Sequence, residues 1–279
     1  MKKLRHFALL ASLVMLHGGC EKPDAIKIAG SSTVLPVVSR AAEQFKLQNP
    51  SVNIIVNSGG SGVGVNQVAA GKIDLGMSSR DITPFEKSRY PDFEFSTHVI
   101  GKDAVVPAVS SEIYDAGVQS LTLGQIAQIY RGEISSWQEV DGPDQEILVI
   151  DKEKSRGTRH VFMEIVMGDK EADAPGADLV LGSNNEEQTA LVQSDAAIGM
   201  LSHAWLNDEV KGLAIILNDQ SVVEPSLENI ISGAYPITRD LLLITNGKLA
   251  EKSRQFIDFI LSSEGQKIVE TSGYVRIVQ

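Results

Sequence analysis

The chain has 279 residues, of which 43% are hydrophobic, 22% charged and 5% aromatic, and its formal net charge is −11. This length allows one large or two medium-sized domains with substantial cores. The low aromatic content argues against a stacking platform for single-stranded nucleic acid, and the negative charge argues against binding to a phosphate backbone. We therefore expect no nucleic-acid partner, and any anion site must be built locally against the overall charge.

The first 24 residues have the layout of an export signal followed by a tether. A basic start over 1–6 precedes an apolar run over 7–16, which is too short to span a bilayer as a permanent helix. We predict that 1–19 is a signal peptide and 20–24 a tether. Cys20, the only cysteine, is the candidate for lipidation, although Leu16 lies four residues before it rather than three. A lipid anchor there would place the exported protein in the periplasm or at the cell surface, and the alternative is a soluble signal sequence with an unrelated cysteine.

Short apolar runs alternate with helical patterns through the first part of the mature sequence. The predicted elements are strands at 25–29, 52–56 and 73–77 and helices at 36–48 and 63–71. This β-α-β-α-β order indicates a parallel sheet with helices on both faces. The long β-like stretch 93–109 contains Gly101 and Pro107, and we expect it to cross between two lobes.

A second alternating series follows. It consists of predicted helices at 123–132, 158–168 and 186–195, strands at 147–151, 197–201, 213–217 and 240–245, and a helical pair at 249–273. The pattern predicts an α/β fold of two lobes, each a mostly parallel sheet flanked by helices, joined by crossing hinge strands. We assign 25–103 and 235–279 to lobe 1 and 104–234 to lobe 2, and expect a small ligand between them.

Four junctions between a strand and a helix carry Ser, Thr, Gly or Arg, namely 30–36, 57–64, 78–81 and 152–159. The first N–H groups of a helix have no partner within the helix, and the helix dipole favours negative charge there. Taken singly, each loop has a simpler explanation, because Ser and Thr at a helix start usually cap the helix. The carboxyl ends of parallel strands share one edge, however, so the loops would converge on the cleft.

Charged groups in these loops suggest an oxyanion rather than a nucleotide. Arg80 can give bidentate hydrogen bonds to an oxyanion. Asp81 could accept the proton of HPO₄²⁻ or H₂PO₄⁻, a proton that sulfate lacks, and the alternative is a surface pair of Arg80 with Asp81. The glycines of the second loop do not have the dinucleotide spacing, and the Lys-Ser/Thr ending of a P-loop is missing.

An alternative function, of the enzymatic class, is that of an exported hydrolase. The sequence positions of His98, His160 and His203 are far apart and form no metal-binding spacing, and no G-x-S-x-G elbow surrounds a serine. These residues argue against an enzyme, and we predict no catalytic residue, no metal site and no cofactor.

Parts of the four loops, 30–36, 61–64, 78–81 and 157–159, and three further segments resemble the periplasmic phosphate-binding proteins of high-affinity phosphate ABC transporters, within the type II solute-binding fold. Segments 121–140, 235–244 and 263–277 are similar to the family's scaffold. The resemblance covers nearly the whole mature chain and implies a monomer that captures inorganic phosphate in its cleft and delivers it to permease subunits. The phosphate-binding residues that it implies are Ser32, Thr33, Ser61, Gly62, Arg80, Asp81, Arg156, Gly157 and Thr158.

The chain departs from the family pattern at two positions. Arg156 stands where family members usually have Ser before Gly-Thr, so either Arg156 contacts the anion or Ser155 supplies a hydroxyl. Some relatives place an aspartate where Arg80 stands, so Asp81 either takes over as proton acceptor or only pairs with Arg80. Arg159 either contacts the ligand less directly or pairs with an acidic loop. The alternative ligands are sulfate, molybdate and tungstate, and the alternative role is a non-transport phosphate sensor.

Overall fold

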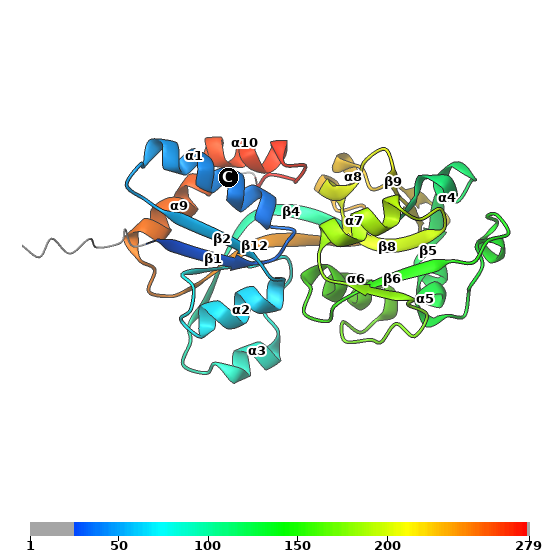
Figure 1. Ribbon diagram of the computed structural model, residues 1–279, viewed down its shortest axis with the longest axis horizontal. Helices are drawn as coiled ribbons and strands as arrows, with labels where there is room; N and C mark the ends of the chain where they lie inside the picture. The colour runs from blue at the N-terminus through cyan, green and yellow to red at the C-terminus, as the bar shows by residue number, and fades with distance from the viewer. Residues whose placement is uncertain (1–24, 278–279) are drawn as a thin grey trace, which may run out of the picture.

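The computed structural model describes residues 25–277, which form two lobes side by side (Figure 1). The predicted signal peptide, the tether and Cys20 lie outside the described residues. Within 25–277, no helix combines the length and the apolar character that a bilayer crossing requires.

The predicted elements are all present, with bounds within three residues of those expected, and further short elements lie between them. The strands are β1 (Ile26–Gly30), β2 (Ile54–Ser58), β3 (Leu75–Ser78), β4 (Phe95–Ser110), β5 (Ser120–Thr122), β6 (Leu148–Lys152), β7 (Leu179–Leu181), β8 (Ala197–Ser202), β9 (Val210–Gly212), β10 (Ala214–Ile216), β11 (Val222–Val223) and β12 (Thr238–Asn246). The helices are α1 (Leu35–Gln48), α2 (Ser61–Ala69), α3 (Pro84–Arg89), α4 (Ser111–Asp115), α5 (Leu123–Arg131), α6 (Gly157–Met167), α7 (Asn184–Val192), α8 (Leu227–Ser232), α9 (Glu251–Leu261) and α10 (Ser263–Thr271), with short 3-10 helices at Trp137–Val140 and His203–Trp205.

The described strands form one sheet that runs through both lobes and a smaller sheet in the second lobe. The large sheet has the order β2-β1-β3-β12-β4-β8-β6-β7, with β9 paired to β4, and the small one the order β11-β10-β5. In the first lobe β1 is parallel to both β2 and β3, and its last residue, Gly30, pairs with Ser58 and Met77. The carboxyl ends of the three strands therefore lie at one edge, where the predicted anion loops begin.

Helices cover both faces of the first lobe. Helices α1, α9 and α10 lie over one face and α2 over the other (Figure 1). The hydrophobic cluster on the first face includes Val37, Phe45 and Phe256, which pack on Ile28 of β1. The apolar stripe of α1 thus fixes the β1–α1 loop over the edge of the sheet.

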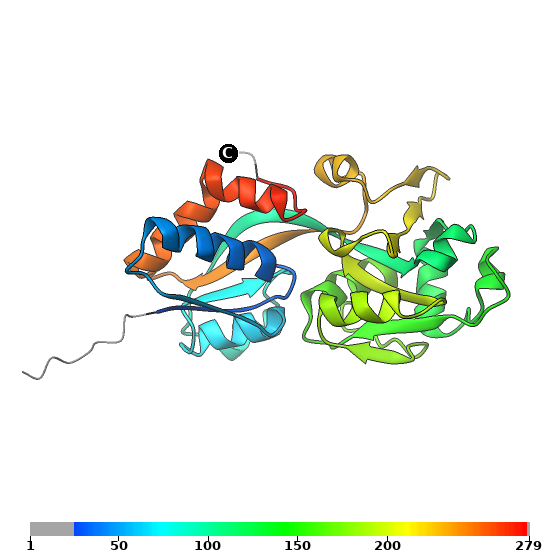
Figure 2. The same ribbon diagram turned by 45° about the horizontal axis from the view of Figure 1, so that its top comes forward.

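Two long strands connect the lobes. Strand β4 is antiparallel to β12 in the first lobe and to β8 in the second, and Figure 2 shows β4 and β12 running side by side from one lobe into the other. In the second lobe β8, β6 and β7 are parallel. The lobe boundaries that we assigned stay a prediction; Ile237 and Val275 pack into the hydrophobic cluster of the second lobe, which begins at Ala104.

Candidate functional site

Serine and threonine side chains of the first lobe meet at the carboxyl edge of its sheet. The Ser31 hydroxyl donates to Ser79 Oγ at 3.0 Å, and the Oγ atoms of Ser61 and Ser79 are 3.4 Å apart. The Thr33 N–H donates to Ser31 Oγ at 3.2 Å. All four side chains are buried. We call these residues, together with Thr158 of the second lobe, the hydroxyl cluster.

The second lobe contributes the start of α6 and of α7 to this cluster. Thr158 Oγ1 lies 3.4 Å from Thr33 Oγ1, and the side-chain amide of Asn184 donates to Thr33 Oγ1 at 3.1 Å. Gly157 packs so closely that a Cβ there would clash with the Ser61 hydroxyl. The two lobes are thus in direct contact across the cluster.

Arg239 of β12 brings a positive charge into the hydroxyl cluster. Its Nε and Nη2 donate to Asp103 Oδ2 of β4 at 3.0 and 2.7 Å. Its Nη1 donates to Thr158 Oγ1 at 3.0 Å and to Ser79 Oγ at 3.4 Å, and Nη2 also donates to Thr33 Oγ1 at 3.2 Å. Arg239 therefore touches both lobes from a crossing strand, and Asp103 balances its charge.

Three of the helices that begin at the cluster, α1, α2 and α6, leave their first N–H groups free of side-chain caps. Helices α1, α2 and α6 have neither a side-chain cap bond nor an acidic residue in the first turn. In contrast, α3, α5 and α7 have capping boxes, completed by Glu86, Gln125 and Glu186. Because no carboxylate occupies the positive ends of α1, α2 and α6, these ends are suited to bind an anion.

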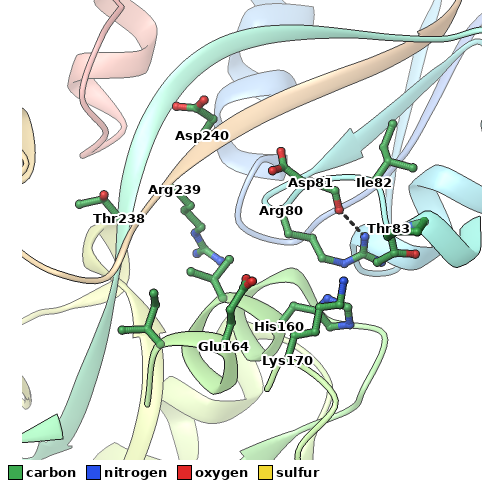
Figure 3. Close-up of a pocket in the computed structure, with 13 residues that line it drawn as sticks. Arg80, Asp81, Ile82, Thr83, His160, Glu164, Lys170, Thr238, Arg239 and Asp240 are labelled. Atoms are coloured by element: carbon green, nitrogen blue, oxygen red, sulfur yellow. Dashed lines mark hydrogen bonds between the residues drawn. The ribbon is translucent and has the colours of Figure 1, made fainter. Parts of the chain in front are cut away.

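Arg80 and Asp81 line a cavity of about 440 Å³ beside the cluster, which Arg239 also lines (Figure 3). The Nη1 and Nη2 atoms of Arg80 donate to the Glu86 carboxylate at 2.9 and 2.8 Å. Arg80 Nε is buried and has no hydrogen-bond partner among the described residues, so it is a donor available to an anion. The Asp81 side chain is exposed and points away from the Arg80 guanidinium (Figure 3).

Ser32 and Arg156 line a different cavity, of about 380 Å³. Arg156 Nε and Nη2 donate to Glu153 Oε2 at 2.8 and 2.5 Å, so the Glu153 carboxylate balances the charge of Arg156. Ser155 contributes its carbonyl oxygen, which accepts the N–H of Gly62 at 3.1 Å across the cleft.

Of the predicted phosphate-binding residues, the structure brings four into mutual contact and places the others around them. The four are Thr33, Ser61, Gly157 and Thr158, and the others are Ser32, Gly62, Arg80, Asp81 and Arg156. Arg159 forms its ion pair with Asp151 of β6, with Nε 3.0 Å from both carboxylate oxygens, and its Nη2 donates to the Ala172 carbonyl of the acidic segment 169–173 at 2.7 Å.

Arg239 and Asn184 were missed by sequence reasoning, whereas Ser31 and Ser79 stand in predicted anion loops but were not among the predicted ligands. Arg239 stands in the segment 235–244, which we interpreted as scaffold only. An arginine next to the apolar run of this strand was a usable signal, because a charged side chain in a buried strand needs a partner. Asn184 lies two residues before the helix predicted at 186–195 and carried no comparable signal.

Buried carboxylates neutralise other cations near the site. Lys152 forms a fully buried ion pair with Glu187, and burial lowers the pKa of Lys152 and raises that of Glu187. Burial and the nearby Arg80 charge lower the pKa of His160 to about 4, so His160 is neutral at pH 7. An anion would thus be held mainly by hydroxyl and N–H dipoles rather than by surplus positive charge.

Within 25–277, no group of three His, Cys, Asp or Glu side chains is placed to hold a metal ion.

The chain is similar to phosphate-binding proteins in both sequence and structure. The sequence pattern of the PBP superfamily domain matches residues 20–264. The phosphate-binding protein PstS of Bacillus subtilis is 31% identical over 254 residues, which cover 91% of this chain and 81% of the relative. A solved structure from Clostridium perfringens with bound phosphate is 32% identical with a TM-score of 0.82, covering 91% of this chain and all (100%) of that one. An ABC-type phosphate transport receptor from Vibrio cholerae is 29% identical with a TM-score of 0.72, covering 90% of this chain and 100% of that one.

Proposed function

Because the chain belongs to the PstS family of phosphate-binding proteins within the PBP superfamily, we propose that it binds inorganic phosphate between its two lobes and delivers it to an ABC permease. The observation that carries this proposal is the convergence of buried hydroxyls from both lobes with Arg239 at three uncapped helix starts. Members of this family are substrate-binding proteins, and we propose that this chain likewise captures its ligand without converting it.

The proposed phosphate ligands form two groups. The first group is supported by mutual contacts in the hydroxyl cluster and consists of Thr33, Ser61, Gly157, Thr158 and Arg239. The second group remains a prediction and consists of Ser32, Gly62, Arg80, Asp81 and Arg156. Within it, Arg80 has the strongest support, because its buried Nε has no partner among the described residues.

Phosphate would stabilise the closed arrangement of the lobes. Thr33 belongs to the first lobe and Thr158 to the second, so an anion between them reaches both sets of donors only when the lobes are together. A ligand shifts a conformational equilibrium only by its difference in affinity for the two states, and this arrangement provides that difference. Strands β4 and β12 are the expected hinge.

We further propose that the protein acts as an exported monomer, attached to the membrane through a lipid at Cys20, with permease subunits as its partners. The layout of residues 1–24 supports the export and the anchor. Labelling cells with radioactive palmitate tests the anchor, since label should enter the wild type and be absent from Cys20→Ser.

Isothermal titration calorimetry with an oxyanion panel tests the ligand. We expect phosphate to bind with one site per chain and to bind more tightly than sulfate, molybdate and tungstate. Tight sulfate binding that phosphate does not compete with would reject phosphate as the ligand. It would indicate that the same fold binds another oxyanion.

A further inference from the structure

Only one of the two polar atoms in the Asn184 side-chain amide has a hydrogen-bond partner among the described residues. Asn184 is the first residue of α7 and is 1% exposed. Its Nδ2 donates to Thr33 Oγ1 of the opposite lobe at 3.1 Å. Its Oδ1 is buried and has no hydrogen-bond partner among residues 25–277. Buried side-chain oxygens without a donor are rare in native proteins, so this one points to a group outside the chain.

Beside an oxyanion site, an unpartnered acceptor indicates that the ligand carries a hydrogen-bond donor. Backbone N–H groups and Arg239 can only donate, and hydroxyls can donate or accept. Phosphate and sulfate both accept hydrogen bonds through four oxygens, so donors alone distinguish them poorly. Near neutral pH phosphate also carries a P–OH group, whereas sulfate does not. An amide oxygen can only accept, and it is therefore matched by the P–OH group and by no group of sulfate.

We propose that Asn184 Oδ1 accepts the hydrogen bond of the P–OH group, which makes Asn184 a residue that determines specificity for phosphate over sulfate. This inference rests on the proposed function. A site built to pair with a ligand hydroxyl rejects analogues that lack it, because the buried acceptor is then left unpaired.

Two carboxylates near the cluster are weaker candidates for the same role. Asp103 accepts two hydrogen bonds from Arg239 at Oδ2 and one from Ser202 at Oδ1, so both of its oxygens are engaged. Asp81 is exposed and points away from Arg80 (Figure 3). Asn184 is instead bonded directly to Thr33, inside the hydroxyl cluster.

Two substitutions at Asn184 separate the acceptor from the donor of its amide. Asn184→Leu has a similar shape and removes both, whereas Asn184→Asp keeps an acceptor, removes the donor and adds a negative charge that repels phosphate and sulfate alike. Asn185→Leu places the same side chain on an exposed neighbouring position and is the matched control. Asp81→Asn tests the rival acceptor. Phosphate affinity is measured by calorimetry near pH 7, sulfate affinity by competition against phosphate, and folding by thermal unfolding.

The proposal predicts that Asn184→Leu weakens phosphate binding by about 10- to 100-fold relative to Asn185→Leu, with a much smaller effect on sulfate. It predicts that Asn184→Asp keeps the preference for phosphate over sulfate, because its carboxylate still accepts the hydrogen bond of the P–OH group, whereas Asn184→Leu loses that preference. Equal losses of phosphate and sulfate affinity in Asn184→Leu would overturn the proposal, because the residue would then not discriminate between the two anions. Loss of the preference in Asp81→Asn but not in Asn184→Leu would also overturn it. Failure of the wild type to bind phosphate would instead reject the proposed function itself.

Discussion

At the scale of single residues, the site depends on close contacts between small groups from different lobes. Gly157 is the clearest example, because its Cα faces the hydroxyls of Ser61 and Ser79. Its backbone has no positive φ, so a larger residue is excluded by the opposite lobe rather than by helix geometry. Closure of the cleft and the size of residue 157 are therefore coupled.

Gly157→Ala should hold the lobes apart without unfolding either one. The added Cβ would lie 2.5 Å from Ser79 Oγ in the closed form, and separation of the lobes relieves the clash. We expect phosphate affinity to fall by roughly 10- to 100-fold, equivalent to about 1.4–2.8 kcal/mol against closure. Calorimetry gives the affinity, and denaturant unfolding should show a change within about 1 kcal/mol.

The control for this variant is Gly124→Ala, also near the start of a helix, where a Cβ would meet nothing closer than the Thr122 hydroxyl at 3.7 Å. It should leave phosphate affinity unchanged. A Gly157→Ala protein that binds phosphate as tightly as this control would contradict the contact between Gly157 and the first lobe.

Arg239 should have separable effects on stability and on binding. Arg239→Gln leaves the buried Asp103 carboxylate without its cation, which should lower the free energy of unfolding by about 3–5 kcal/mol. Adding Asp103→Asn removes that stranded charge and should restore much of the stability, while phosphate binding stays at least about tenfold weaker than in the wild type. Chemical denaturation and calorimetry measure the two quantities. Wild-type affinity in the double variant would show that Arg239 only supports the fold.

At the scale of secondary structure, the helices divide by the way they begin. Helices α3, α5 and α7 have capping boxes, whereas α1, α2 and α6 start at the hydroxyl cluster without a side-chain cap or an acidic first turn. Capping side chains satisfy the same N–H groups that bind an anion. The absence of caps at these three starts is thus consistent with a site reserved for a ligand.

Long elements were predictable from the sequence, and short ones were not. The predicted strand at 25–29 and helix at 36–48 correspond to β1 and α1 with shifts of one residue at most. Strands β5, β7, β9 and β11 and helices α4 and α8 were missed, because two to six residues carry too little periodicity to stand out. Helix α3 was also missed, although Thr83 and Glu86 have the spacing of a capping box.

Site residues could be predicted where the local sequence determines their position, and not where the order of strands in the sheet determines it. Thr33, Ser61 and Thr158 follow parallel strands, so the strand-to-helix rule locates them. Arg239 reaches the site because β12 inserts between β3 and β4, an order that local sequence patterns do not contain. Arg239 and Asn184 therefore required the structure.

Helix α6 carries a group whose protonation opposes folding. The pKa of His160 is lowered from 6.5 to about 4 by burial and by the Arg80 charge. Between these pH values the unfolded chain binds more protons than the folded protein. The free energy of unfolding should therefore fall as the pH is lowered from 6.5 towards 4, with a contribution of at most about 1.4 kcal/mol per pH unit from His160.

Denaturant unfolding of the wild type and of His160→Gln across this pH window measures the effect. Both proteins share the same carboxylates, so the difference between the two curves reports on His160 and its pair with Glu171 at 3.1 Å. The stability of the variant should decline less steeply with acidification. Parallel curves would mean that His160 titrates at its ordinary pKa in the folded protein.

At the scale of the whole molecule, one sheet extends through both lobes and two crossing strands connect them (Figure 2). The two-lobe α/β fold expected from the sequence is confirmed. The predicted anion loops of the two lobes contact each other through Thr33 and Thr158. The chain has a net charge of −11, so the local dipoles and Arg239 must hold the anion against repulsion from the rest of the protein.

A crystal structure of the protein grown with phosphate tests the central claim most directly. We expect phosphate between the lobes, with its oxygens within hydrogen-bonding distance of Thr33, Ser61 and Thr158 and of the N–H groups at the start of α6. A phosphate ion bound away from the hydroxyl cluster, in contact with none of Thr33, Ser61 and Thr158, would contradict the account.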